Sequence, residues 1–316
     1  MDRKLAVIAI GGNSLIKDRQ HQDVREQYML AGETCRHLAS MIEQGWDLVV
    51  GHGNGPQVGF ILRRSELAAH ELHEVPLDVC GADSQGAIGY ALVQNLQNEL
   101  RKRGIDRPVA ALVTQTEVAA DDPAFANPTK PIGSFMEEPE ANRRREEDGW
   151  NVVSDAGRGW RRVVASPRPL RIVEQAAIER IVKAGVILIA VGGGGIPVVA
   201  DSAGDLHGAE AVIDKDLGVS LLARQLGADM FLITTAVEKV ALNFGTPEER
   251  PLDHLSLSEA KAYLAEGTHF AKGSMAPKVQ AVIEFLEAGG KEALITDPAN
   301  VERALAGETG TRFTAS

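Results

Sequence analysis

The sequence predicts an α/β protein in which helices cover both faces of a mainly parallel sheet. Apolar runs typical of buried strands alternate along the chain with segments of helical pattern. Such alternation favours a parallel, doubly wound sheet. Several of these runs end in glycines, and one long stretch interrupts the rhythm. The expected strands begin near residues 5, 47, 108, 185, 228 and 292.

The first expected strand, residues 5–10, reads LAVIAI and contains no polar residue. A run of this kind suits a strand that is buried on both faces. Gly11 and Gly12 follow at once, and without a Cβ atom they let the backbone come close to a ligand. Because open α/β sheets bind ligands at the carboxyl ends of their strands, a ligand site is expected here.

Later runs repeat this pattern. The strand from 47 ends in GHGNGPQVG, and the strand from 185 ends in VGGGGIP. A helix at about 84–103 precedes the strand at 108–114, and the last two strands occupy 228–235 and 292–296. Glycine-rich ends that meet at one edge of a parallel sheet predict a site where backbone N–H groups bind an anion.

The common nucleotide-binding motifs are missing. The chain has no G-x-x-x-x-G-K-[ST], and GNGPQVG is spaced G-x-G-x-x-x-G, unlike the dinucleotide fingerprint. A P-loop enzyme and a dinucleotide-dependent oxidoreductase are therefore disfavoured.

The stretch 118–169 breaks the alternation of strands and helices. It is rich in Pro, Gly, Arg and Glu, and it ends in the hairpin-like GWRRVVASPRP. Because a structureless loop of this length is unusual in a compact domain, we expect a small inserted subdomain or lid. A surface insertion without function is the alternative.

Composition restricts the class of partner and the compartment. The 316 residues carry a net charge of −11, which disfavours a nucleic-acid partner. Cys35 and Cys80 form no CxxC motif, so a reducing cytoplasm is expected. No apolar run approaches the length of a membrane span, and the first residues do not resemble a signal peptide.

Two lysine-containing segments are candidates for binding an anion. Lys215 lies between Asp214 and Asp216 at an expected helix start, although acidic residues also stabilise the first turn of a helix by themselves. Lys278 follows GSMAP, where Gly273 and Ser274 suggest a loop and an N-cap. The helix dipole disfavours a cation near the start of a helix. The position of Lys278 is therefore better explained by a bound phosphate than by stabilisation of the helix itself.

Taken together, these motifs resemble those of the carbamate kinases, a branch of the amino acid kinase superfamily. The resemblance runs nearly end to end. It rests on AIGGN, HGNGPQVG, NPTKPIG, GWRRVV, GGGGIPV, VIDKD and GSMAPK, in this order. It implies a three-layer α/β/α sandwich forming a single domain over 1–316, with the stretch 118–169 as a protruding lid subdomain. It also implies a homodimer.

The resemblance further implies reversible phosphoryl transfer between ATP and carbamate with Mg²⁺, and ATP synthesis from ADP and carbamoyl phosphate in arginine catabolism. Three groups of site residues follow from the matched motifs. The catalytic residues would be Lys130, Lys215, Asp216 and Lys278. The residues that bind substrate or phosphate would be Gly11, Gly12, Asn13, Gly53, Asn54 and Gly55. The residues near the nucleotide would be Asp214, Thr234, Ala236, Val237 and Met275, and no protein metal ligand is assigned.

This reaction suits a site made of lysines and backbone N–H groups. Carbamate is already an anion and needs no general base, whereas alcohol kinases more often use a carboxylate base. We therefore interpret His52 as a polar neighbour of the site. Ala165, Ser134 and Lys272 depart from the family pattern, and the first two could loosen the lid. A diverged small-carboxylate or carbamoyl phosphotransferase and a weakly active nucleotide-binding regulator remain alternatives.

Overall fold

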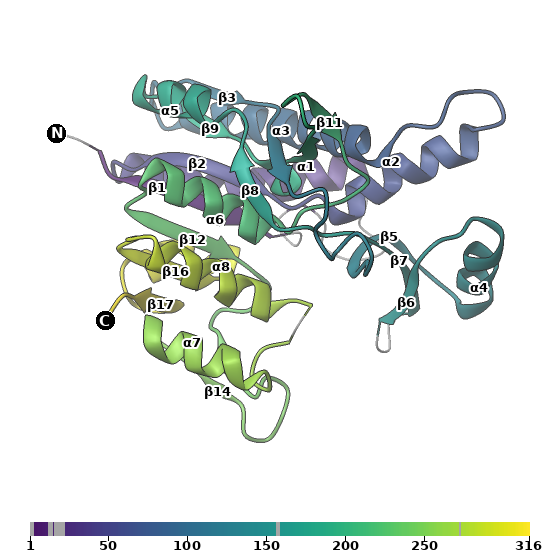
Figure 1. Ribbon diagram of the computed structural model, residues 1–316. Helices are drawn as coiled ribbons and strands as arrows, with labels where there is room; N and C mark the ends of the chain where they lie inside the picture. Colours follow the sequence, from purple (N-terminus) through teal and green to yellow (C-terminus); the bar gives the residue numbers. More distant parts are fainter. Residues whose placement is uncertain (1–2, 12–14, 16–22, 156–158, 272) are drawn as a thin grey trace.

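The largest sheet in the described part of the chain has eight strands, in the order β15-β17-β16-β12-β1-β2-β9-β3. The computed structural model describes residues 3–11, 15, 23–155, 159–271 and 273–316 (Figure 1). Every neighbouring pair in this sheet is parallel except β16 with β17. The predicted class, a mainly parallel α/β sheet, is therefore confirmed.

All six expected runs form strands of this sheet. They are β1 (Leu5–Ile10), β2 (Asp47–His52), β3 (Val109–Ala111), β9 (Ile187–Ile189), β12 (Met230–Thr234) and β16 (Glu292–Thr296). Two short strands that were not predicted, β15 (His254–Ser256) and β17 (Thr311–Thr314), complete it.

Helices cover both faces of the sheet, which explains why its strands are continuously apolar. Along β1, Val7 and Ala9 pack into one core, while Ala6 and Ile8 pack into the other. The first core also contains side chains of α5 (Gln175–Lys183), α6 (Lys215–Leu226), α7 (Leu257–Glu266) and α8 (Met275–Glu287). The second contains side chains of α1 (Val24–Glu43), α3 (Leu77–Lys102) and α9 (Val301–Leu305).

The helix expected at about 84–103 begins earlier, at Leu77, so the predicted start was wrong. Leu77 and Cys80 are buried against Val58 and Ile132, in contacts between segments far apart in sequence. The local sequence pattern gives no information about these distant contacts. They stabilise about two further turns at the start of α3.

A second sheet of four strands was not predicted. Its order is β11-β10-β4-β8, and β4 pairs in parallel with β10 and antiparallel with β8. The strands are β4 (Gln115–Val118), β8 (Pro169–Ile172), β10 (Ile196–Ala200) and β11 (Leu206–Gly208). Outside the stretch between β4 and β8, the other described elements are α2 (Gly55–Ala68), the pair β13 (Ala241–Leu242) and β14 (Arg250–Pro251), and the short helices η2 (Gly192–Gly194) and η3 (Pro298–Asn300).

The stretch between β4 and β8 has secondary structure of its own. It contains β5 (Lys130–Met136), α4 (Glu138–Glu147), β6 (Val152–Asp155) and β7 (Gly159–Val164), and its antiparallel sheet has the order β5-β7-β6. Figure 1 shows β6 and α4 projecting beside α2, on the side away from both termini. Within the described residues, no helix is long and apolar enough to cross a membrane.

Candidate active site

Three glycine-rich strand ends meet at one cavity of about 330 Å³, here called the strand-end cavity. Gly11 follows β1, Gly53 follows β2, and Gly193 lies in η2 after β9; all three line it. Asn54 and Gly55 also line it, and the Asn54 amide donates to Ser84 Oγ at 2.8 Å. Gly193 has φ +66°, and a Cβ atom there would lie 2.2 Å from the Asn54 amide nitrogen. Only glycine fits so close to Asn54 in this backbone conformation.

A buried carboxylate holds two lysines at this cavity. Lys215 Nζ donates to Asp216 Oδ1 at 2.5 Å, and Lys278 Nζ donates to Asp216 Oδ2 at 2.8 Å. Lys215 and Asp216 form the first turn of α6, and Lys278 lies in the first turns of α8. Helices from two distant parts of the sequence thus bring both ammonium groups to one carboxylate.

Burial and charge oppose each other in this cluster. Burial alone would raise the pKa of Asp216, but Lys215 and Lys278 hold it below its ordinary value. Burial lowers the pKa of Lys215, and Asp216 opposes that shift. Burial also acts to lower the pKa of Lys278, but the neighbouring Asp216 raises it overall. The carboxylate therefore stays ionised and fixes the two ammonium groups.

Asp214 links the start of α6 to the inserted segment. It is the N-cap of α6, and one of its side-chain oxygens accepts from the Asp216 N–H at 2.9 Å. The other accepts from Lys130 Nζ, at the start of β5, at 2.6 Å. Burial would raise the pKa of Asp214, but Lys130 and Lys215 hold it well below its usual range.

The cavity carries an excess of positive charge. Lys130, Lys215 and Lys278 face two carboxylates, Asp214 and Asp216, and Arg161 adds a fourth cation to the lining. Arg161 donates to the Gly133 carbonyl at 3.1 Å and lies over the Phe135 ring at 5.1 Å. A cavity with surplus ammonium and guanidinium groups binds and stabilises anions such as phosphoryl groups.

Sequence reasoning missed Arg161 as a site residue, although it lies in the quoted GWRRVV. The antiparallel pairing of β7 with β5 brings it to the cavity that Lys130 also lines, and that pairing cannot be read from local sequence. Thr235, Pro131 and Ile213 also line the cavity without having been singled out.

The residues expected near the nucleotide are unevenly placed around this cavity. Ala236 lines the cavity, but Thr234, Val237 and Met275 do not. Thr234 Oγ1 accepts from the Gly11 N–H at 3.2 Å, so this N–H already has a partner within the protein. A Cβ atom on Gly11 would also lie 2.7 Å from the Thr234 carbonyl oxygen. The glycine at this position is therefore required by close packing of β1 against β12. Gly12 and Asn13 lie outside the described residues.

His52 is buried and absent from the residues that line the cavity. Its Nδ1 lies 3.1 Å from the Gly53 carbonyl oxygen, and burial lowers its pKa to about 4. This geometry fits a neutral imidazole that supports the strand end.

The three departures from the family pattern lie apart from the lysine cluster or outside the described part. Ser134 lines a different cavity, and the Ala165 carbonyl accepts from the Val212 N–H at 2.9 Å beside α6. Lys272 lies outside the described residues.

Comparison with known proteins assigns the chain to a family. Residues 4–297 match the model of the Amino acid kinase family, so the chain belongs to this family. The chain is 47% identical over 313 residues to the carbamate kinase of Thermococcus kodakarensis, covering 98% of each chain. It is 50% identical to the Carbamate kinase-like protein YqeA of Escherichia coli, with 98% of this chain and 99% of the relative covered.

A solved structure agrees with these relatives. The carbamate kinase from Giardia lamblia bound to AMP-PNP has a TM-score of 0.91 and 42% identity to this chain. The match covers 99% of this chain and 98% of that structure. The resemblance to carbamate kinases drawn from the sequence motifs is confirmed.

Proposed function

We propose that this protein is a carbamate kinase, which transfers a phosphoryl group reversibly between ATP and carbamate. The observation that carries the proposal is the lysine–aspartate cluster at the strand-end cavity, in a chain 47% identical to a curated carbamate kinase. In the catabolic direction, carbamoyl phosphate and ADP give ATP and carbamate.

The charges of the cluster suit the phosphoryl group in transfer. Lys215 and Lys278, both held by Asp216, would contact its oxygens from α6 and α8. The bond from phosphorus to the carbamate oxygen breaks while a bond to the terminal oxygen of ADP forms, and no net proton transfer is needed. Positioning and charge neutralisation are then the main contributions of the protein. A neutral, buried His52 agrees with a reaction that needs no base.

Lys130 is placed to act from the inserted segment. It now donates to Asp214, and a bound carbamoyl phosphate would offer it an alternative anionic partner. We propose that the segment 118–169 acts as a lid, with Lys130 exchanging between Asp214 and substrate.

The nucleotide would enter past Thr235, Ala236 and Ser274, which line the same cavity. Within the described residues, no cluster of His, Cys, Asp and Glu is arranged to hold a metal ion. Both oxygens of Asp216 already accept from lysines. Mg²⁺ would therefore arrive on the nucleotide phosphates, where it neutralises charge, in keeping with its preference for phosphate and water ligands.

ATP formation from ADP, Mg²⁺ and carbamoyl phosphate tests the proposal. We expect turnover by the wild type, loss of turnover in Lys215→Ala and a lower rate in Lys130→Ala. Lys183→Ala, at a side chain that is 73% exposed and far from the cavity, is the matched control and should keep full activity. A folded wild type that binds ADP but makes no ATP would overturn the proposal and favour a diverged substrate or a regulator.

A homodimer in the cytoplasm is proposed from the same family resemblance. Light scattering of the purified protein tests the dimer, because a mass of one chain at micromolar concentration would exclude a stable one.

A further inference from the structure

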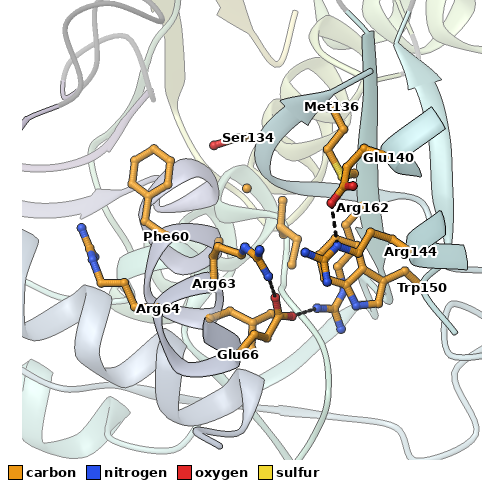
Figure 2. Close-up of a pocket in the computed structure, with 14 residues that line it drawn as sticks. Phe60, Arg63, Arg64, Glu66, Ser134, Met136, Glu140, Arg144, Trp150 and Arg162 are labelled. Atoms are coloured by element: carbon orange, nitrogen blue, oxygen red, sulfur yellow. Dashed lines mark hydrogen bonds and ion pairs between the residues drawn. The ribbon is translucent and has the colours of Figure 1, made fainter. Parts of the chain in front are cut away.

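A second cavity, of about 380 Å³, lies between α2 and the inserted segment and is here called the α2 cavity. Figure 2 shows Phe60, Arg63 and Glu66 of α2 on one side and Met136, Arg144 and Trp150 of the inserted segment on the other. It shares no lining residue with the strand-end cavity. Its volume suits a small organic ligand.

The charged side chains of this cavity are unevenly balanced. Its lining contains four arginines, Arg63, Arg64, Arg144 and Arg162, against two glutamates, Glu66 and Glu140. Arg144 donates to Glu140 and to Asp148, at 2.8 Å and 2.7 Å, so the surplus rests on the other three arginines. Arg63 and Arg162 both donate to Glu66, at 3.3 Å and 2.8 Å, and neither has another acceptor among the described residues. Each guanidinium has five N–H donors, so most of these donors have no partner in the described part of the protein.

Flat and apolar groups stand beside these cations. Arg162 and Arg144 lie over the Trp150 ring, at 4.6 Å and 5.1 Å from its centroid. Phe60, Ile132 and Met136 supply further apolar surface. Guanidinium groups bind carboxylates through paired hydrogen bonds and also stack on flat rings, so the cavity combines both kinds of recognition.

We propose that the α2 cavity is a second ligand site, which binds a small planar organic anion of the aromatic carboxylate class. The surplus guanidinium donors would bind the carboxylate, while Trp150 and the apolar side chains would contact the ring. Inorganic phosphate would neutralise the guanidinium charges of the cavity but would make no contact with its apolar side chains.

The backbone connects this site to the strand-end cavity. Lys130 and Pro131 of β5 line the strand-end cavity, while Ile132, Gly133 and Ser134 line the α2 cavity. At their boundary α2 and β5 touch through glycines, because a Cβ atom on Gly59 would lie 2.1 Å from Gly133 Cα. A ligand in the α2 cavity would therefore bias the position of β5 and Lys130. An effect of this ligand on turnover rests on the proposed kinase function, whereas binding of the ligand to the α2 cavity does not depend on that function.

Calorimetric titration of the full-length protein with naphthoate tests the site directly. We expect saturable binding at millimolar or lower concentration that is unchanged by saturating MgADP. The neutral naphthamide should bind at least about tenfold more weakly, since it loses hydrogen bonds between charged groups. Any binding of inorganic phosphate should occur in the strand-end cavity and should be unchanged in Ser134→Trp.

Variants locate the site without altering the lysine cluster. Ser134→Trp should fill the cavity and abolish binding, while Ser154→Trp, at an exposed position on β6 that lines neither cavity, should leave it intact. Arg63→Gln should weaken binding at least about tenfold and serves if Ser134→Trp fails to fold.

The proposal is overturned by any of four results. These are no saturable naphthoate binding, naphthoate binding lost in MgADP, equal affinity for naphthamide, or undiminished naphthoate binding in both Ser134→Trp and Arg63→Gln. If the protein proves inactive as a kinase, calorimetry still decides whether the site exists. If it is active, naphthoate should change the rate of ATP formation in the wild type and leave Ser134→Trp unaffected.

Discussion

The strand-end cavity and the α2 cavity are both lined by β5, but they are formed by different kinds of groups. The first is formed by backbone at strand ends and by helix starts that hold Lys215, Asp216 and Lys278 in buried ion pairs. The second is formed by long side chains that reach across from separate segments, such as Arg162 to Glu66. Rigid elements fix charges where a reaction needs them, whereas long side chains form a surface that can adjust to a ligand.

The largest effect is expected where the rigid cavity loses its central carboxylate. Asp216→Asn keeps the shape but removes the charge that fixes both lysines, so kcat should fall by about 10²–10³-fold. Steady-state kinetics of ATP formation measures it. Asp253→Asn, at an 83% exposed aspartate that also pairs with a lysine, is the control and should retain wild-type kcat. If kcat fell equally in the two variants, the buried position of Asp216 would not be what makes this carboxylate important for the reaction.

The boundary between the cavities offers the next test. Gly59→Ala would place a methyl group against the Gly133 backbone, and such overpacking costs about 1–3 kcal/mol of unfolding free energy. Gly86→Ala, in α3 with open space around it, should be neutral or stabilising by up to about 1 kcal/mol. Urea unfolding of both variants compares them. If Gly59→Ala were as stable as Gly86→Ala, the two segments would not be in close contact in solution.

The same contrast explains which parts of the molecule the sequence could predict. Gly11, Gly53 and Lys278 lie in contiguous motifs at strand ends or helix starts, so their convergence follows from the topology of a parallel sheet. Arg161 reaches the same cavity through the pairing of β5 with β7, which depends on a register set in three dimensions. The α2 cavity depends wholly on contacts between segments that are distant in sequence, and no sequence motif predicts it.

Short elements were missed for a related reason. The strands β8 and β11 have only four and three residues and lie in stretches rich in proline or glycine. β8 is stabilised by β4, a partner distant in the sequence, whereas β11 pairs antiparallel with β10, the strand just before it. Thr234 is expected near the nucleotide from its motif, and its Oγ1 also accepts from the Gly11 N–H, a contact that the motif does not reveal. The motif shows where Thr234 lies in the fold but not which group it contacts.

His52, which lies behind the strand-end cavity against Gly53, allows the packing of this strand end to be tested through pH. Burial lowers its pKa from 6.5 to about 4. Between pH 6.5 and pH 4, His52 is therefore protonated in the unfolded chain but neutral in the folded protein. Stability is therefore lost as pH falls from 6.5, by about 2 kcal/mol near pH 5. Urea unfolding at several pH values should give a shallower slope for His52→Asn than for the wild type. The exposed His70→Asn serves as the control and should keep the wild-type slope.

The smallest effect is expected at the ion pair between Glu66 and Arg162, which joins α2 to the inserted segment at 2.8 Å. Both side chains are partly exposed, at 19% and 24%, so solvent screens the pair and its coupling should be about 1 kcal/mol or less. A double-mutant cycle with Glu66→Gln and Arg162→Gln, followed by urea unfolding, measures this energy. Because Lys130 lies on the neighbouring strand, the same variants should change KM for carbamoyl phosphate more than kcat. A large loss of kcat would instead show that the α2 side is as rigidly coupled to the reaction as the lysine cluster.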